Sequence, residues 1–187
     1  MLDAYDYYQN IIPNKNGCAN PSFFRLLNKL KFELYEKTIL EIGFNNGKDL
    51  IECEKRGAYI YGLEINKNAL ENPCFKKKAN IKFSKAGEDK IPFDKNFDLI
   101  YSIGTVCYLN RDQLCFFFED LGDNLKKDGL IIIQIPENDI FIENTNLNEN
   151  LNLEVFQKSE FKRIDSLNNP YRFIESKEII ETANLNN

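Results

Sequence analysis

The 187-residue sequence contains no histidine and no tryptophan, and it has a single methionine and five cysteines. The lack of histidine removes the commonest general base and metal ligand, and it excludes every catalytic dyad or triad built on an imidazole. The cysteines are odd in number and form no C-x-x-C pair, so neither a disulfide framework nor a zinc site is expected. We therefore expect no metal, and chemistry that uses carboxylates, tyrosines, lysines or a reactive cofactor.

Long apolar runs and a surplus of positive charge are also missing. No apolar stretch approaches the about 20 residues of a membrane span, and the acidic, aromatic start MLDAYDYYQN differs from a signal peptide. The net charge of −5 argues against a nucleic-acid surface, which needs clustered lysine and arginine. We expect one cytoplasmic domain without membrane or nucleic-acid partners. The frequent Asn, Lys, Ile and Phe residues suggest an AT-rich bacterial source.

Short β-type runs alternate with helical patterns between Thr38 and Ile135. Such alternation predicts a mainly parallel sheet with helices on both faces, a doubly wound, Rossmann-like α/β fold. The expected strands are 38–42, 58–65, 81–84, 97–102 and 130–135, and the expected helices are 21–36, 48–56, 67–71 and 111–127. In such sheets, ligands bind at the carboxyl ends of the strands.

The stretch TILEIGFNNGKDL joins the first strand to a helix through a turn that holds Gly43, Asn45, Asn46 and Gly47. A turn with few bulky side chains lets the backbone approach a ligand closely, and the following helix offers free N–H groups. A nucleotide-like ligand and a mere tight connection explain the turn about equally well.

Acidic or polar residues and one glycine stand at, or just after, the carboxyl ends of the strands. They are Glu41, Glu64, Gly87, Glu88, Asp89, Ser102, Glu137 and Asp139. Each acid alone is most simply a solvated loop carboxylate, but together at one sheet edge they indicate a ligand site. Glu64, at the end of the second strand, is placed to accept hydrogen bonds from both ribose hydroxyls.

The identity of the ligand follows from what the turn lacks. A dinucleotide fingerprint needs glycine where this sequence has Asn45 and Lys48. A pyrophosphate would also meet the nearby Glu41, so a cationic ligand fits better. S-adenosylmethionine combines an adenosine with a sulfonium and an amino-acid head. Glu41 is then expected below the turn, accepting hydrogen bonds from turn N–H groups or from the ammonium of the ligand.

Over residues 38–135 the sequence resembles the class I S-adenosylmethionine-dependent methyltransferases of small molecules. The matching stretches are LEIGFNNGKDL, YGLEIN, AGEDKIPF, FDLIYSIGTVCYL and NLKKDGLIIIQ. The resemblance implies cofactor contacts at Glu41, Gly43, Asn45, Gly47, Glu64, Ile65, Gly87, Glu88, Asp89 and Ser102, with either Glu88 or Asp89 at the adenine. Asn45 replaces the middle glycine of the family loop, and asparagine tolerates the left-handed conformation that this position needs.

The resemblance also suggests where the methyl acceptor binds. Tyr108 stands where many small-molecule members have histidine, so Tyr108, Glu137 or Asp139 would act as a base if the acceptor needs one. The fourth strand ends in Ser102-Ile103-Gly104-Thr105 rather than N/D-P-P-Y, which favours a small-molecule acceptor and O-methylation. Tyr5 and Tyr8 would form an aromatic lid, or else part of a helix on the sheet.

The expected single domain has three parts: N-terminal lid and helices (1–37), cofactor-binding core (38–135), and substrate-side insertion with a C-terminal helix (136–187). The tail PYRFIESKEII resembles the helix that precedes the last two strands of the family, where Arg172 would contact an anionic acceptor or remain solvated. Those two strands either come from the Asn-rich region or are absent. A non-catalytic binding module with the same fold is the main alternative function, and a nucleotide-dependent oxidoreductase is a weaker one.

Overall fold

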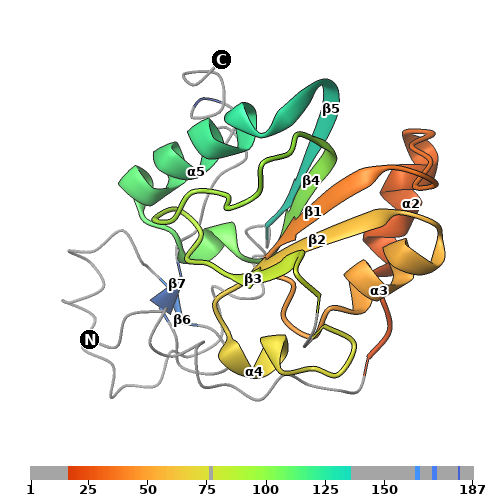
Figure 1. The fold of residues 1–187 in the computed structure, drawn as a ribbon. Helices are drawn as coiled ribbons and strands as arrows, with labels where there is room; N and C mark the ends of the chain where they lie inside the picture. The colour runs from red at the N-terminus through yellow and green to blue at the C-terminus, as the bar shows by residue number, and fades with distance from the viewer. Residues whose placement is uncertain (1–16, 76–77, 136–162, 165–169, 172–180, 182–187) are drawn as a thin grey trace.

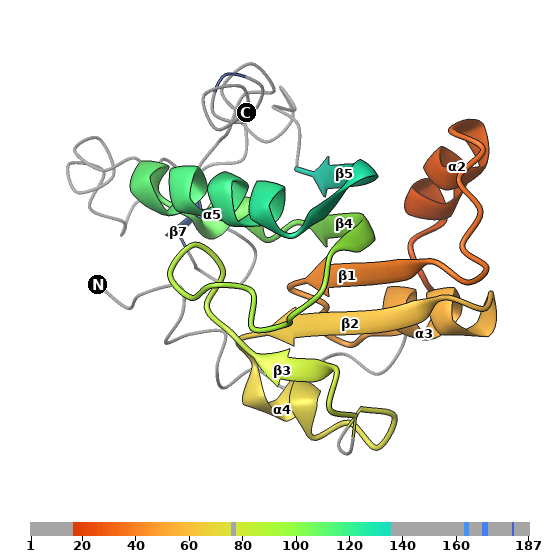
Figure 2. The same ribbon diagram turned by 45° about the horizontal axis from the view of Figure 1, so that its top comes forward.

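The computed structural model describes residues 17–75, 78–135, 163–164, 170–171 and 181. Its main feature is a five-stranded sheet in the order β3-β2-β1-β4-β5 (Figure 1). The strands are β1 (Thr38–Ile42), β2 (Tyr59–Glu64), β3 (Ile81–Phe83), β4 (Phe97–Ile103) and β5 (Leu125–Gln134). All four neighbouring pairs are parallel, so the carboxyl ends of the strands share one edge (Figure 2). The expected Rossmann-like fold is confirmed.

Helices lie before β1 and between all consecutive strands of the sheet except β3 and β4, and they cover both of its faces (Figures 1 and 2). They are α2 (Pro21–Lys29), α3 (Lys48–Lys55), α4 (Lys67–Leu70) and α5 (Arg111–Asp123), with a short 3₁₀ turn η1 (Val106–Tyr108) after β4. None of the helices in the described ranges is long and apolar enough to cross a membrane.

The core has two layers because alternate side chains of a strand point to opposite faces. In β1, Ile39 packs with buried residues of α2 and α3, whereas Leu40 and Ile42 pack with α5. Both β1 and its neighbour β4 are therefore apolar on both faces, as parallel strands inside a covered sheet should be. Glu41 and Tyr101 are the polar exceptions on the α2/α3 side, since both are buried there.

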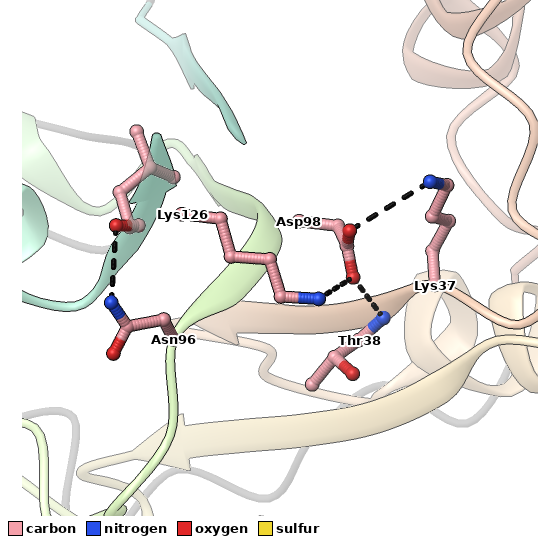
Figure 3. A network of polar contacts seen from close by, with 6 residues as sticks. Lys37, Thr38, Asn96, Asp98 and Lys126 are labelled. Carbon is pink, nitrogen blue, oxygen red and sulfur yellow. Dashed lines mark hydrogen bonds and ion pairs between the residues drawn. The ribbon is translucent and has the colours of Figure 1, made fainter. Parts of the chain in front are cut away.

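The amino edge of the sheet is held by a polar network around Asp98 of β4 (Figure 3). The Asp98 carboxylate accepts a 2.8 Å hydrogen bond from the Thr38 backbone N–H of β1 and another from the Lys126 ammonium of β5. Lys37 lies 3.7 Å away on the other side. Asp98 therefore links β1, β4 and β5 at the edge opposite their carboxyl ends.

Two helix ends differ from the sequence-based expectation. The first helix was expected to reach Glu36 but ends at Lys29, because Lys31 takes a left-handed conformation with φ 55° and turns the chain. Leu34 is still buried, although it reaches the core from the loop that follows.

The helix expected over 111–127 ends at Asp123, and β5 begins at Leu125 instead of Leu130. The register between β4 and β5 shifts between the pairs Phe97–Leu125 and Leu99–Leu130, which accommodates the extra residues. Lys126 therefore donates a hydrogen bond to Asp98 from β5, and it does not lie at the end of a helix.

The C-terminal part has two short described strands. β6 (Arg163–Ile164) and β7 (Pro170–Tyr171) form an antiparallel pair separate from the main sheet. The helix expected to start at Pro170 is thus wrong at these two residues. The Asn-rich stretch 143–152 lies outside the described residues.

Candidate functional site

The turn between β1 and α3 lies at the carboxyl edge of the sheet, beside the point where the strand order reverses between β1 and β4. Its backbone is left-handed at Gly43 (φ 80°), Asn45 (φ 48°) and Gly47 (φ 69°). The expected tolerance of asparagine at position 45 is thus confirmed. The Gly43 N–H donates to the Leu63 carbonyl oxygen at 2.8 Å, which ties the turn to the end of β2.

Both glycines of the turn are required by protein neighbours. A Cβ atom at Gly43 would lie 1.9 Å from the hydroxyl oxygen of Thr105, and one at Gly47 would lie 2.1 Å from the ring of Phe75. The Thr105 hydroxyl also donates to the Ile42 carbonyl oxygen at 3.3 Å. The turn is therefore packed between the loop after β4 and Phe75, and Thr105 is a site neighbour that the sequence did not single out.

Glu64 ends β2 and is buried, with its carboxylate turned back onto the backbone. Oε2 accepts a 2.5 Å hydrogen bond from the Asn45 N–H, and Oε1 accepts from the N–H groups of Ile65 (2.8 Å) and Asn66 (2.9 Å). Burial raises the pKa of Glu64, and the three N–H groups act in the opposite direction. Since each carboxylate oxygen has two lone pairs, Oε2 keeps room for one further donor.

Glu41 is also buried, one strand away in β1. Its Oε2 accepts a 2.8 Å hydrogen bond from the Tyr101 hydroxyl of β4. Burial raises the pKa of Glu41 well above its usual value, and the negative charges of Asp49 and Glu64 add to this. The Tyr101 hydroxyl and the Leu50 N–H, in the first turn of α3, act against the increase. The turn N–H of Asn45 is taken by Glu64, so the contacts of Glu41 come from β4 and α3.

The segment after β3 is tied to α5. Gly87 is left-handed (φ 80°), and a Cβ atom there would lie 2.8 Å from the Gln113 carbonyl oxygen. Glu88 accepts a 3.0 Å hydrogen bond from the Gln113 amide and pairs with Lys85, whereas Asp89 accepts from the Lys85 N–H at 2.8 Å. Asp89 thus closes its own turn, and the Glu88 side chain reaches toward α5.

The end of β4 contributes one buried and two half-buried groups. The Ser102 hydroxyl is fully buried and donates to the Ile42 carbonyl oxygen at 2.9 Å, so it links β4 to β1. Gly104 is left-handed (φ 71°), and a Cβ atom there would have no neighbour within 4 Å. Tyr108 follows in η1, where it is half-buried.

The structure brings the first, second and fourth strand ends together around the glycine turn. Tyr5, Tyr8, Glu137, Asp139 and Arg172 lie outside the described residues. Tyr101 was not recognised from the sequence, although a phenol inside an apolar strand signals a buried hydrogen-bond partner. No group of three or more His, Cys, Asp or Glu side chains in the described ranges is arranged to hold a metal ion.

The arrangement fits a cationic nucleoside. Two carboxyl groups are buried at adjacent strand ends, and burial disfavours the charge of each. A positive group placed near them would stabilise both carboxylates. Glu64 has remaining acceptor capacity for a hydroxyl, and it already accepts from the Asn45 N–H of the glycine turn. These features define a Rossmann-like α/β protein of the class I methyltransferase type.

The chain belongs to the methyltransferase domain family, whose pattern matches residues 19–182. S-adenosylmethionine is therefore the expected cofactor. No protein of curated function matches the sequence.

Solved structures share the fold at low sequence identity. The PH0226 protein of Pyrococcus horikoshii has a TM-score of 0.65 and 16% identity, over 96% of this chain and 88% of that one. An S-adenosylmethionine-dependent methyltransferase of Mesorhizobium loti has a TM-score of 0.54 and 19% identity, over 63% and 55%. The glycopeptide N-methyltransferase MtfA has a TM-score of 0.50 and 14% identity, over 62% and 55%. The match thus spans about half the length of the last two proteins.

Proposed function

We propose that this protein transfers a methyl group from S-adenosylmethionine to an oxygen atom of a small molecule. The observation that carries the proposal is the pair of buried carboxyl groups, Glu41 and Glu64, at the carboxyl ends of the neighbouring strands β1 and β2. The family match supports the reaction class. The acidic surface charge and the absence of an N/D-P-P-Y sequence after β4 support a small acceptor.

The described residues divide the work of holding the donor. Glu64 accepts a ribose hydroxyl at Oε2, while its other contacts keep the turn and the start of α4 in place. Glu41 faces the amino-acid head, whose ammonium offsets the cost of the buried carboxylate. Ile65 and the Gly87–Asp89 segment border the adenosine, with the Glu88 or Asp89 carboxylate as acceptor for the adenine amino group. The floor of the proposed donor site is formed by Gly43, Asn45, Gly47 and Ser102.

When bound, S-adenosylmethionine would supply a methyl group attached to a positively charged sulfur, and a neutral thioether would be the leaving group. The acceptor oxygen would take the methyl group and pass its proton to the proposed base. The protein has mainly to align the acceptor and exclude water. Tyr108 lies just beyond the end of β4 and is the proposed group beside the acceptor. Glu137 is the proposed base, and Tyr5, Tyr8 and Arg172 are proposed acceptor contacts.

Calorimetry with S-adenosylmethionine tests donor binding. We expect Glu64→Ala to weaken binding at least tenfold, since it removes a charged hydrogen bond worth about 1.5–3 kcal/mol and releases the Asn45 N–H. Glu33→Ala, which changes an exposed glutamate outside the site, is the matched control and should bind like the parent. A parent protein that does not bind at millimolar donor would end the proposal.

The acceptor atom needs a turnover assay. Methyl-labelled donor is incubated with pools of small hydroxy, amino and carboxylic acids, and labelled products are identified by mass spectrometry. Labelled ethers or esters support O-methylation, whereas labelled amines move the assignment to nitrogen. Donor binding without product in any pool favours the alternative, a non-catalytic binding module with this fold.

A further inference from the structure

Tyr101 lies in the middle of β4, fully buried, where the register places it beside Glu41 of β1 and Ile132 of β5. A phenol in such a position needs a hydrogen-bond partner, because an unpaired buried hydroxyl is costly. Its partner is the Glu41 carboxylate, at 2.8 Å from oxygen to oxygen. The hydroxyl has no solvent to turn to, so this contact fixes where the Glu41 carboxylate lies.

The ring of Tyr101 is fixed from its other side by α2. Phe23 stacks on it with ring centroids 4.3 Å apart and planes inclined by 21°. The start of α2 is in turn held at the carboxyl edge through Asn20. Its N–H donates to the Asp49 carboxylate of α3 at 2.6 Å, and its side-chain amide donates to Gln134 of β5 at 3.1 Å.

The charged and titratable groups around Glu41 come from three elements. Asp49 and Cys53 lie on α3, Glu64 ends β2, and Tyr101 lies on β4. Burial raises the pKa of Cys53 to about 12, so its thiol stays neutral. Asp49 and Glu64 both disfavour a charge on Glu41. The Tyr101 hydroxyl and the Leu50 N–H are thus the groups that favour the carboxylate before any cation arrives.

We propose that Tyr101 is a positioning residue for donor binding: its hydroxyl holds the Glu41 carboxylate beside the first turn of α3, and Phe23 of α2 holds Tyr101. This inference rests on the proposed function, because it assigns to Glu41 the ammonium of the donor. It also links α2, which lies before the five-stranded core in the sequence, to the affinity of the donor site.

The test uses S-adenosylhomocysteine, which keeps the amino-acid head, in calorimetric titrations between about pH 5.5 and pH 8.5. Tyr101→Phe keeps the ring stack and removes only the hydroxyl. Without the hydrogen bond from the Tyr101 hydroxyl, the pKa of Glu41 rises further, so Glu41 becomes protonated at a higher pH than in the parent. We expect about tenfold weaker binding at the acidic end. The pH at which affinity declines should move up relative to that of the parent.

Two comparisons separate positioning from a general structural effect. Tyr61→Phe is the matched control, because Tyr61 lies in β2 with its ring against Phe93 and Phe97. It should leave both the affinity and its pH dependence unchanged. In a Glu41→Gln background, Tyr101→Phe should have no further effect on affinity, since the group that it positions has already lost its charge.

The outcomes are distinct. If the parent protein binds no S-adenosylhomocysteine, the proposed function fails and this inference with it. If the parent binds and Tyr101→Phe shows the same affinity and pH profile, only the inference is overturned. A loss of equal size in the Glu41→Gln background also overturns it. If Tyr101→Phe does not fold, Phe23→Leu replaces it, with weaker binding expected only while Glu41 is present.

Discussion

Glu41 and Glu64 end up in different surroundings although they close neighbouring strands. Glu64 is surrounded by backbone N–H groups of its own loop and of the glycine turn. Glu41 depends on a phenol from β4 and on the first turn of α3. The spacing of the sequence predicted both positions, because strand ends and glycine turns are local features. Their partners were not predictable, since Tyr101 meets Glu41 only once β1 and β4 pair.

Because the pKa of Glu41 is raised in the folded protein, the charged form of this side chain lowers the free energy of unfolding. The folded protein binds this proton more tightly than the unfolded chain, whose pKa is near 4.5, so the cost is full above the folded pKa and absent below 4.5. We therefore expect Glu41→Gln to unfold at a higher temperature than the parent at pH 8. The gain should be about 2–4 °C for each kcal/mol recovered.

Thermal unfolding followed by circular dichroism at pH 8 and at pH 4 measures this difference. At pH 4 the side chain is protonated in both states, so the advantage of the variant should disappear. The same variant should bind the donor more weakly. A lower unfolding temperature at pH 8 would mean that the charged form of Glu41 stabilises the fold.

The left-handed backbone at Asn45 gives a second test at the residue scale. Its φ of 48° is unfavourable for most side chains. Asn45→Ala should therefore destabilise the protein by about 1 kcal/mol, whereas Asn45→Gly should be nearly neutral. Urea unfolding measures both, and donor titration of Asn45→Gly should give a parent-like affinity. Equal stability of the alanine and glycine variants would contradict this account of the turn.

The helices show that starts were easier to predict than ends. Asn20 and Asn110 cap α2 and α5 with their own side chains, which accept from N–H groups two or three residues ahead. Such caps are written in a few adjacent residues. The ends depend on partners far along the chain: α5 stops at Asp123 because the next residues pair with β4. Leu30, Leu34 and Leu125 continue the helical spacing beyond these ends, and for this reason both helices were predicted to be too long.

The capping box of α5 provides a prediction at the scale of one element. The Asn110 side chain accepts from the Gln113 N–H at 2.9 Å, and the Gln113 side chain accepts from the Asn110 N–H at 2.8 Å. Asn110→Ala should cost about 1 kcal/mol of unfolding free energy, and Asn110→Ser should recover most of it. Urea unfolding measures both. A serine variant as unstable as the alanine variant would show that Asn110 acts through something other than the cap.

Across the whole molecule, the two edges of the sheet are electrostatically different. At the carboxyl edge, Glu41 and Glu64 are buried acids whose pKa values are raised. At the amino edge, Asp98 is matched by Lys37 and Lys126 (Figure 3). The two acids with raised pKa values lie where a cationic ligand is expected. Asp98, which is paired with two lysines, lies where it links neighbouring strands. The sequence indicated the first edge through its motif order, but at the second edge Lys126 was assigned to the end of a helix and Lys37 was not singled out.

The amino edge predicts a specific pH dependence of stability. Burial alone would raise the pKa of Asp98, but the Lys126 ammonium and the Thr38 N–H outweigh it and lower the pKa below its ordinary value of 3.8. A lowered pKa adds stability that is complete above the unfolded value and is lost as pH falls through the folded one. The Asp98 side chain is only 16% exposed, whereas the lysines are 44–47% exposed, so solvent weakens the contribution of the lysines and leaves the Thr38 contact less affected.

We expect Asp98→Asn to lower the unfolding free energy by about 1–2 kcal/mol at pH 7, with a smaller loss for Lys126→Gln. Lys127→Gln, an exposed neighbour on the same strand, is the control and should be neutral. Urea unfolding between pH 7 and pH 2.5 measures the gap between parent and Asp98→Asn. It should close as the parent aspartate becomes protonated, because both side chains are then neutral acceptors for the Thr38 N–H. A gap that stays constant or widens toward pH 2.5 would show that Asp98 stabilises the sheet through packing and not through its charge.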